Sequence, residues 1–297
     1  MKIYGDYHTH TDYSDGKDSI DQMVASATAK GLQEIAITDH GHGKYMGRFK
    51  RRDYAHARAL IEKAGVDHGI KTFFGVEANV TSRDGRVDVF AEDRKDIDIL
   101  ICGIHRFVRT GVTSFFTWLA PNWFFGTIRW TPKWLRRRNT EIMKRAIERN
   151  DVDIWAHPNR YFKLDVLAVA KMCVERGTAI ELSGKKISFR PIDFERMQSI
   201  GAKFVINSDA HSSKSVGSID RVAEFLKNCD WQEGDILNLN TPFHRPPCMS
   251  IEQAMAKTAE PVVDVRELSK QRKEENAKAK AEKKEQVKRE KVLRKKD

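Results

Sequence analysis

Residues 7–16 read YHTHTDYSDG, and this stretch decides how the rest of the chain is interpreted. His8 and His10 stand two positions apart, so on a β-strand their side chains would point to the same face. Two adjacent imidazoles contribute little to packing but are well suited to binding a metal ion. A single pair of this kind also occurs by chance on surface strands, so its meaning depends on what the chain places beside it.

The apolar pattern around this stretch predicts an α/β fold. Short, near-continuous apolar runs, typical of buried parallel strands, alternate with amphipathic stretches. Repeated βα units of this kind indicate a closed or nearly closed parallel barrel. The predicted strands are residues 2–7, 33–38, 72–77, 98–104, 152–156, 178–182 and 203–207. The predicted helices include residues 19–30, 52–67, 134–149, 164–176, 192–200 and 217–228.

Length and composition suit one barrel with an extension. The chain has 297 residues, 40% of them hydrophobic, which is enough for a large core. We expect the barrel domain over residues 1–263 and a separate charged extension over residues 264–297. Four widely spaced cysteines without a CxxC motif indicate reduced thiols. No signal peptide and no apolar run long enough to span a membrane is found, so we expect a cytoplasmic protein.

The predicted extension is strongly basic. Residues 264–297 hold 14 Lys and Arg against 8 Asp and Glu, which is +6 of the chain's net charge of +11. Pairs such as Glu274 and Lys278 have the spacing that supports a solvated helix. Two interpretations stay open: an exposed, Lys-rich helical or disordered extension, or a segment that contacts nucleic acid or another polyanion.

Residues 109–134 interrupt the βα rhythm with a cluster of aromatic residues. The stretch TSFFTWLAPNWFFGTIRWTPKW holds four of the six tryptophans and four phenylalanines. It is too short, and too broken by Pro121 and Asn122, to span a membrane. One interpretation is a hydrophobic hairpin packed on the body or on a second copy of the chain, which would make a homo-oligomer. The others are an active-site lid, or a platform that stacks bases or touches a membrane surface.

Side chains able to bind a metal ion follow six of the seven predicted strands. The C-terminal ends of barrel strands share one rim, so these side chains should converge there. Asp15, in the first loop, adds to them. The resulting nine candidate ligands are His8, His10, Asp15, His40, Glu77, His105, His157, Asp209 and His211.

Nine ligands are more than one ion needs. A mononuclear catalytic site uses about three protein ligands plus water, so nine indicate two or three divalent ions. Imidazole and carboxylate without thiolate suit Zn²⁺, Mn²⁺ or Fe²⁺. Clustered ions about 3.5–4 Å apart commonly bridge a hydroxide and stabilise in-line displacement at phosphorus. No serine or cysteine nucleophile is then required.

Six ordered motifs resemble those of the PHP (polymerase and histidinol phosphatase) family. They are DYHTHTDYSDG, AITDHG, GVEANV, GIH, AHP and NSDAH, and the resemblance covers roughly residues 1–230. The phrases GVEANVTSRDGRVDV and INSDAHSSKSVG are most similar to the stand-alone phosphatases of the YcdX-like branch. The resemblance implies a distorted (β/α)7 barrel, a trinuclear metal site and hydrolysis of a phosphomonoester by a metal-bridging hydroxide.

The resemblance also implies how the nine ligands are grouped. Glu77 and Asp209 would be the carboxylates most directly tied to catalysis. The first ion would be held by His8, His10, Glu77 and Asp209. The second would share Glu77 and be completed by His105 and His157. The third would be held by Asp15, His40 and His211.

Further charged residues lie close to the predicted rim. Arg106, Arg160 and Lys185 follow the fourth, fifth and sixth strands, where they would either bind substrate phosphate or be ordinary solvated charges. Asp39 would either orient a ligand or serve as a turn residue at a strand end. Glu181 would face the barrel interior or a metal.

Several functions stay open at this point. The expected partner is a small phosphorylated substrate, with histidinol phosphate, a nucleotide or sugar phosphate, and an oligonucleotide end as alternatives. An amidohydrolase-type barrel also opens with two histidines two apart, but its fourth strand supplies a lysine where this chain has His105. A non-catalytic scaffold for the basic extension would not need all nine positions filled.

Overall fold

The computed structural model describes residues 1–45, 47, 49–127 and 130–257. The predicted extension, residues 264–297, lies outside the described residues, as does the proposed domain boundary at residue 263. Both therefore stay predictions.

Seven parallel strands form one sheet in which each strand pairs with the next along the chain. All seven match the strands predicted from the apolar pattern. The strands are β1 (Gly5–Asp6), β2 (Glu34–Ile37), β3 (Lys71–Asn79), β4 (Ile99–Gly103), β5 (Ile154–Trp155), β6 (Ala179–Ser183) and β7 (Phe204–Asn207).

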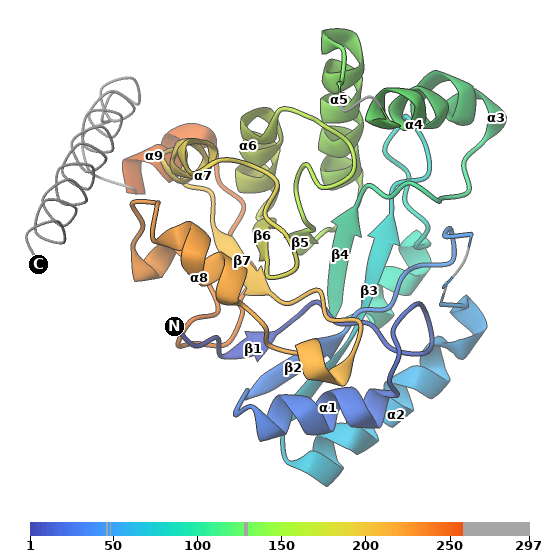
Figure 1. The fold of residues 1–297 in the computed structure, drawn as a ribbon, viewed down its shortest axis with the longest axis vertical. Helices are drawn as coiled ribbons and strands as arrows, with labels where there is room; N and C mark the ends of the chain where they lie inside the picture. Colours follow the sequence, from blue (N-terminus) through green and yellow to red (C-terminus); the bar gives the residue numbers. More distant parts are fainter. Residues whose placement is uncertain (46, 48, 128–129, 258–297) are drawn as a thin grey trace, which may run out of the picture. The chain divides into compact units, whose positions relative to one another are not determined.

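Contacts between the first and last strands curl this sheet into a nearly closed barrel (Figure 1). The pairing occurs just beyond the two strands, where Thr9 and Ala210 form a parallel bridge. The backbone N–H of His10 donates to the carbonyl of Ala210 at 2.8 Å. The first histidine pair therefore lies at the seam of the barrel, beside the end of β7.

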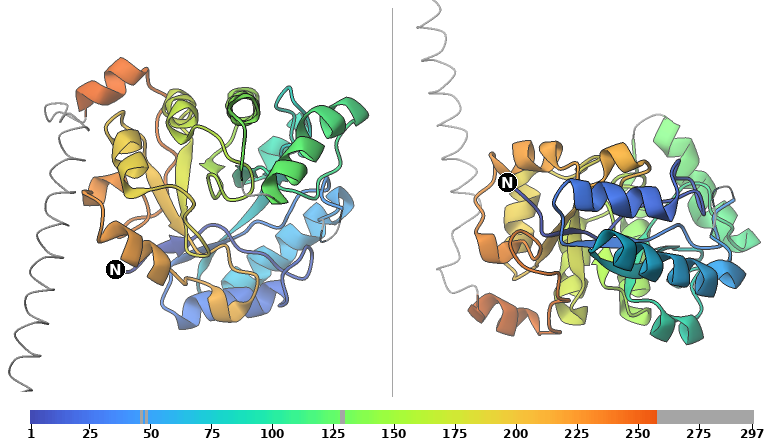
Figure 2. Two further views of the ribbon diagram at one scale, coloured as in Figure 1. Left: turned by 45° about the horizontal axis from the view of Figure 1, so that its top comes forward. Right: turned by 90° about the horizontal axis from the view of Figure 1, so that it is seen from below.

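Helices cover the outside of the sheet, as two further views show (Figure 2). Those that follow the predicted pattern are α1 (Ile20–Ala29), α2 (Tyr54–His68), α5 (Lys133–Arg149), α6 (Val166–Arg176), α7 (Pro191–Gln198) and α8 (Asp220–Leu226). A further short helix, α9 (Ile251–Lys257), follows β7 and α8. No helix in the described part of the chain is long and apolar enough to cross a membrane.

Strand alternation separates two apolar layers. Side chains such as Ala36, Ile101 and Val205 form a buried cluster of their own, while their immediate neighbours join the larger core that includes the helices. Successive strand residues point to opposite faces, so the smaller cluster fills the barrel interior. Glu77 and Glu181 have the same parity along their strands as Phe73 and Ala179 of that cluster. Their carboxylates therefore point into the barrel.

The aromatic stretch is helical. It forms α3 (Val112–Ser114), a π-helical turn (Phe115–Leu119) and α4 (Ala120–Thr127). Pro121 does not break this segment because the carbonyl of Thr117, which Pro121 cannot bond, finds another donor. Thr117 O accepts from the guanidinium of Arg138, and Trp118 O accepts from Asn122 Nδ2 at 2.8 Å. The segment is thereby tied to α5.

Candidate metal centre

The nine candidate ligands converge at the C-terminal ends of the strands. Seven are buried, whereas Asp15 is exposed and His211 half-buried. Their donor atoms fall into overlapping groups close enough to share an ion, and Glu77 lies between these groups. His40 follows β2, and Glu77 lies on β3. The two residues lie side by side, because they form a parallel bridge just past the end of β2.

One group surrounds Glu77 Oε1. This oxygen lies 2.8 Å from His157 Nε2 and 3.1 Å from His105 Nε2. The two imidazole nitrogens are themselves 3.2 Å apart. Two nitrogens bound to one tetrahedral Zn²⁺ at about 2.0–2.1 Å would be roughly 3.4 Å apart. The three atoms are therefore close enough to approach one ion, and His40 also lies within reach of a point shared with Glu77 and His105.

A second group joins the first histidine pair to the end of β7. His8, His10 and Asp209 each offer a ligand atom to one point. The Nε2 atoms of His8 and His10 lie 4.0 and 3.6 Å, respectively, from Asp209 Oδ1. The same two nitrogens lie 3.3 and 3.5 Å from Glu77 Oε2. Glu77 thus presents one oxygen to this group and the other to His105 and His157.

The third group lies nearer the surface. Asp15 Oδ1 is 3.5 Å from His40 Nε2 and 3.4 Å from His211 Nε2. His10 is also within reach of this group. The mixture of two imidazoles and one carboxylate is a common ligand set for divalent transition metals.

Unpaired atoms in the centre fit bound cations. Among the described residues, nine buried side-chain nitrogen or oxygen atoms lack a hydrogen-bond partner, and six of them belong to candidate ligands. Such an atom costs about 1–3 kcal/mol when nothing satisfies it. His40 Nδ1 and Glu77 Oε2, which lie 2.8 Å apart, are two of these six atoms. The residues present therefore fit a metal cluster.

Glu181, whose role the sequence left open, contacts two candidate ligands. Its Oε1 lies 2.6 Å from His8 Nδ1, and its Oε2 accepts from the backbone N–H of His157 at 2.7 Å. A carboxylate on Nδ1 keeps the proton there and leaves Nε2 free for a metal. Of the two positions predicted for Glu181, the structure shows the one in the barrel interior. From there its carboxylate orients His8.

Asp39 contacts the first loop. It accepts from the backbone N–H of Thr11 at 2.7 Å, from Thr11 Oγ1 at 2.6 Å and from Ser14 Oγ. The described contacts give it no hydrogen bond to an imidazole. Asp39 thus fixes the loop that carries Asp15, rather than orienting His40 directly.

Two candidate ligands have unusual backbones. His157 has φ 27° and Asp209 has φ 54°, in the left-handed region that favours glycine. Such conformations persist only where surrounding contacts hold them, and they gather at functional sites. For His157 the hydrogen bond to Glu181 supplies such a contact.

The electrostatic environment favours cations. Burial alone would lower the pKa of His8, but Glu181 and Glu77 outweigh it and raise that pKa well above its ordinary value. Burial and the neighbouring His40 lower the pKa of His10 well below its ordinary value. Burial opposes ionisation of Glu77, yet His105 and other histidines hold its pKa well below the usual range. A neutral His10 and an ionised Glu77 are the forms that bind metals.

Cationic side chains lie beside the ligands. The guanidinium of Arg160 contacts Asp209, and Lys185 Nζ lies 3.6 Å from Asp209 Oδ1. Lys44, which the sequence did not single out, lies 2.6 Å from Asp15 Oδ2. Arg106 is exposed, and no described contact joins it to a candidate ligand. Lys44 could be recognised only from the structure, because it lies in a loop and does not follow a predicted strand.

Comparison with known proteins agrees with this geometry. The PHP domain profile matches residues 6–181, more than half of the chain. The chain belongs to the PHP domain family. This PHP domain is a metal-dependent phosphoesterase, a hydrolase acting on phosphoric ester bonds.

Relatives of similar length support the assignment. A probable phosphatase of Shewanella sp. (strain MR-4) is 27% identical over 248 residues, which cover 80% of this chain and 88% of the relative. A probable phosphatase of Thermoanaerobacter sp. (strain X514) is 29% identical over 249 residues, covering 80% of this chain and 91% of the relative.

A solved structure supports the fold. A candidate histidinol phosphatase of Listeria monocytogenes superposes with a TM-score of 0.53 at 15% identity, covering 72% of this chain and 97% of the other.

The amidohydrolase-type alternative needs a lysine on the fourth strand. Here β4 reads ILICG and contains none.

Proposed function

We propose that this PHP domain hydrolyses a small phosphomonoester at a centre of three divalent ions. His8, His10 and Asp209 would hold one ion, His105 and His157 a second, and Asp15, His40 and His211 a third. Glu77 would be shared between the first two. The observation that supports this grouping is the position of Glu77, whose two oxygens face different sets of histidines.

The ligand set suits Zn²⁺, Mn²⁺ or Fe²⁺ and does not select strongly among them. When bound, such ions would lower the pKa of water and offset negative charge on the phosphoryl group. Glu77 and Asp209 would keep the centre negative enough to hold them.

The chain's own residues would bind the phosphate. Arg160 is about nine-tenths buried, with 13% of its side chain exposed, and lies against Asp209. Lys185 is more open, with 41% exposed. An arginine fork beside the ligands matches two phosphate oxygens, and Lys185 adds a mobile charge at the edge. Together they would orient the ester over the ligand cluster.

Tyr161 would shape the wall of the same site. Its ring centroid lies 5.4 Å from that of His105 and 5.5 Å from that of His157, and the guanidinium of Arg160 lies over the same ring at 5.3 Å. The ring thus restricts the positions of two candidate ligands and of the phosphate-binding arginine.

A substrate panel tests this proposal. Purified protein reconstituted with Mn²⁺ or Zn²⁺ would be given a chromogenic phosphomonoester, the matching phosphodiester, and an ester and an amide that lack phosphorus. Fast release of phosphate from the monoester alone supports the proposal. Faster cleavage of the amide or the carboxylic ester would favour an amidohydrolase, and no turnover of any compound would favour a scaffold.

The same assay then ranks physiological candidates. Histidinol phosphate, nucleotide and sugar phosphates, and oligonucleotides with a terminal phosphate differ in size beyond the phosphate. A cytoplasmic location, contact of residues 264–297 with nucleic acid, and a homo-oligomer formed through residues 109–134 stay predictions.

A further inference from the structure

The exposed apolar side chains of this molecule are concentrated in one segment. Eleven large hydrophobic residues are exposed in the described chain, and six of them lie within residues 107–134. Scattered exposed apolar residues are normal, whereas a contiguous patch indicates an interaction surface. We name these six the aromatic ridge: Phe107, Val112, Phe116, Phe124, Trp130 and Trp134.

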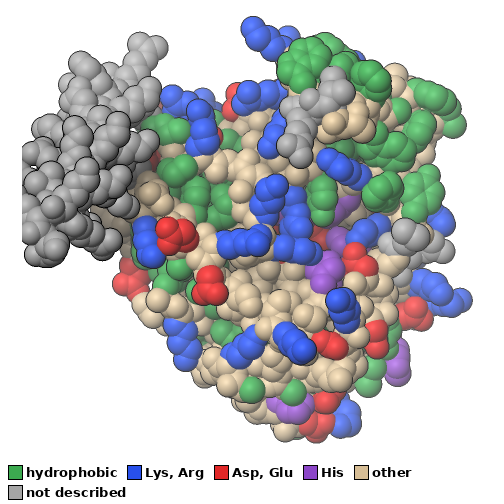
Figure 3. All heavy atoms as spheres, in the orientation of Figure 1, with side chains coloured by type: hydrophobic (Ala, Val, Ile, Leu, Met, Phe, Trp, Pro, Cys, Tyr) green, Lys and Arg blue, Asp and Glu red, His purple; other side chains and the backbone are tan. Residues whose placement is uncertain are grey.

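Ring contacts join the aromatic side chains of this segment into two groups. Phe107 packs on Trp123, which contacts Phe115, with ring centroids 5.8 and 5.6 Å apart. At the other end, Phe125 contacts both Trp130 and Trp134, at 5.4 and 6.3 Å. Hydrophobic side chains accordingly gather over α3 and α4 on one face of the molecule (Figure 3).

The same stretch carries only positive charge. Residues 99–140 contain seven Arg and Lys and no Asp or Glu. Among the described residues, the six basic ones of this stretch form no ion pair with a carboxylate, whereas arginines elsewhere, such as Arg51, Arg94 and Arg245, do. Basic side chains without a carboxylate partner, beside exposed rings, leave this surface complementary to an anionic one.

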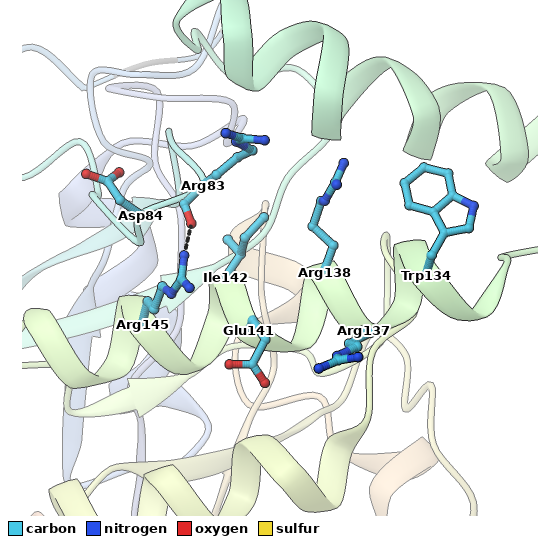
Figure 4. A pocket seen from close by; sticks show the side chains of 8 residues that line it. All are labelled: Arg83, Asp84, Trp134, Arg137, Arg138, Glu141, Ile142 and Arg145. Atoms are coloured by element: carbon cyan, nitrogen blue, oxygen red, sulfur yellow. Dashed lines mark hydrogen bonds between the residues drawn. The ribbon is translucent and has the colours of Figure 1, made fainter.

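A basic cavity of about 480 Å³ adjoins the ridge at Trp134 (Figure 4). Arg83, Arg137, Arg138 and Arg145 line it. Its two carboxylates are engaged elsewhere: Asp84 with Arg86 and Arg149, and Glu141 with Lys144. Trp134 and Arg138 project from the same side of α5, with the guanidinium 5.2 Å from the ring. The cavity therefore offers planar donors suited to a phosphodiester headgroup.

We propose that the aromatic ridge and this cavity dock the protein on the surface of an anionic phospholipid membrane. Aromatic side chains of α4 and α5 lie next to Arg and Lys of α5, and this combination is typical of interfacial segments. Anionic lipid attracts each nearby basic residue, and buried rings add apolar contact. The protein would lie on the membrane, with the ridge inserted among the headgroups.

A single-stranded nucleic acid fits the ridge less well. Bases stack on the open faces of aromatic rings along a groove. Here neighbouring rings meet edge to face: Phe115 with Phe116 at 87°, Phe124 with Phe125 at 80°, and Phe125 with Trp130 at 74°. The ridge also includes the aliphatic Val112, which has no face for stacking.

Vesicle co-sedimentation of the full chain tests the proposal. Wild-type protein would be mixed with vesicles of phosphatidylcholine alone or with about one third phosphatidylglycerol. We expect salt-sensitive binding to the anionic vesicles only. The double variant F116S/F124S should bind more weakly by tenfold or more, since burying each phenylalanine is worth about tenfold. R83Q/R137Q should also weaken binding.

Two control variants remove an exposed apolar side chain and an exposed charge that lie outside the ridge and the cavity. V66S removes another exposed apolar side chain, 83% exposed, and R52Q removes another exposed charge, 76% exposed. Both should bind anionic vesicles like wild type, and melting temperatures check that all variants fold. Wild type that stays in solution with both vesicles would overturn the proposal, as would equal binding by F116S/F124S.

Two other outcomes would also overturn it. One is tight binding of a single-stranded oligonucleotide, weakened by F116S/F124S, without vesicle binding. The other is a dimer in sedimentation velocity that F116S/F124S converts to monomer, again without vesicle binding.

Discussion

Glu181 Oε1 lies 2.6 Å from His8 Nδ1 at the seam of the barrel. The contact leaves Nε2 of His8 facing Glu77 and Asp209, where an ion would bind. The other oxygen of Glu181 holds the backbone of His157. One interior carboxylate thus positions ligands from two of the three proposed groups.

The Glu181→Gln variant tests this positioning role. Glutamine keeps the shape but loses the charge that fixes the His8 tautomer, so metal affinity and kcat should each fall about 10- to 100-fold. Isothermal titration with Zn²⁺ or Mn²⁺ and steady-state kinetics give both numbers. Glu34→Gln is a matched control, because Glu34 is also buried but bonds Tyr7 at the other end of the barrel. Equal behaviour of the two variants would contradict the role.

A second test concerns the sharing of Glu77. Its Oε1 faces His105 and His157, while its Oε2 lies near His8 and His10. Glu77→Gln should therefore lower activity and metal content together, with more than one ion lost per chain. His40→Ala should affect one ion and cost less activity. Elemental analysis beside kinetics decides the matter, and mild, equal losses in both variants would argue against a shared carboxylate.

Variants of the three predicted phosphate-binding residues should differ in kcat/KM. Arg160 and Lys185 lie against Asp209, but Arg106 is exposed and lies near α4, where a Cβ on Gly126 would be 3.6 Å from its Nη2. A charged hydrogen bond is worth about 1.5–3 kcal/mol, so Arg160→Gln should reduce kcat/KM about 10- to 100-fold. Metal content should stay unchanged. Lys185→Gln should show a smaller loss.

Arg106→Gln serves as the comparison for these two. It should leave kcat/KM for a small phosphomonoester within about twofold of wild type, because no described contact brings Arg106 to the ligands. If Arg106→Gln lowered kcat/KM as much as Arg160→Gln, Arg106 would have to move toward the ligands when substrate binds, which would contradict its assignment as a residue outside the site.

The fold was predictable because the signal repeats. Each buried parallel strand is a short apolar run, and the chain supplies seven of them, alternating with helical stretches. The strand ends then place His40, Glu77 and His105 on one rim without further information. The first strand is shorter than predicted, since Tyr4 donates its N–H to Asn238 rather than to a neighbouring strand.

Other features depend on contacts that no local pattern records. The position of Glu181 on β6 allows an interior carboxylate, but its partner His8 is 173 residues away. Lys44 reaches Asp15 from a loop. Pro121 and Asn122 suggested a break in the aromatic stretch, yet Arg138 supplies the donor that Pro121 lacks and the helix continues.

We propose that the clustered ligands bind ions that the reaction requires. The direct measurement is phosphate release from a chromogenic phosphomonoester, recorded while a chelator-stripped protein is titrated with Mn²⁺ or Zn²⁺ and its bound metal is counted. We predict no turnover without metal and activity that rises as two to three ions bind per chain. Undiminished turnover by metal-free protein, or full activity with one ion or fewer per chain, would contradict it.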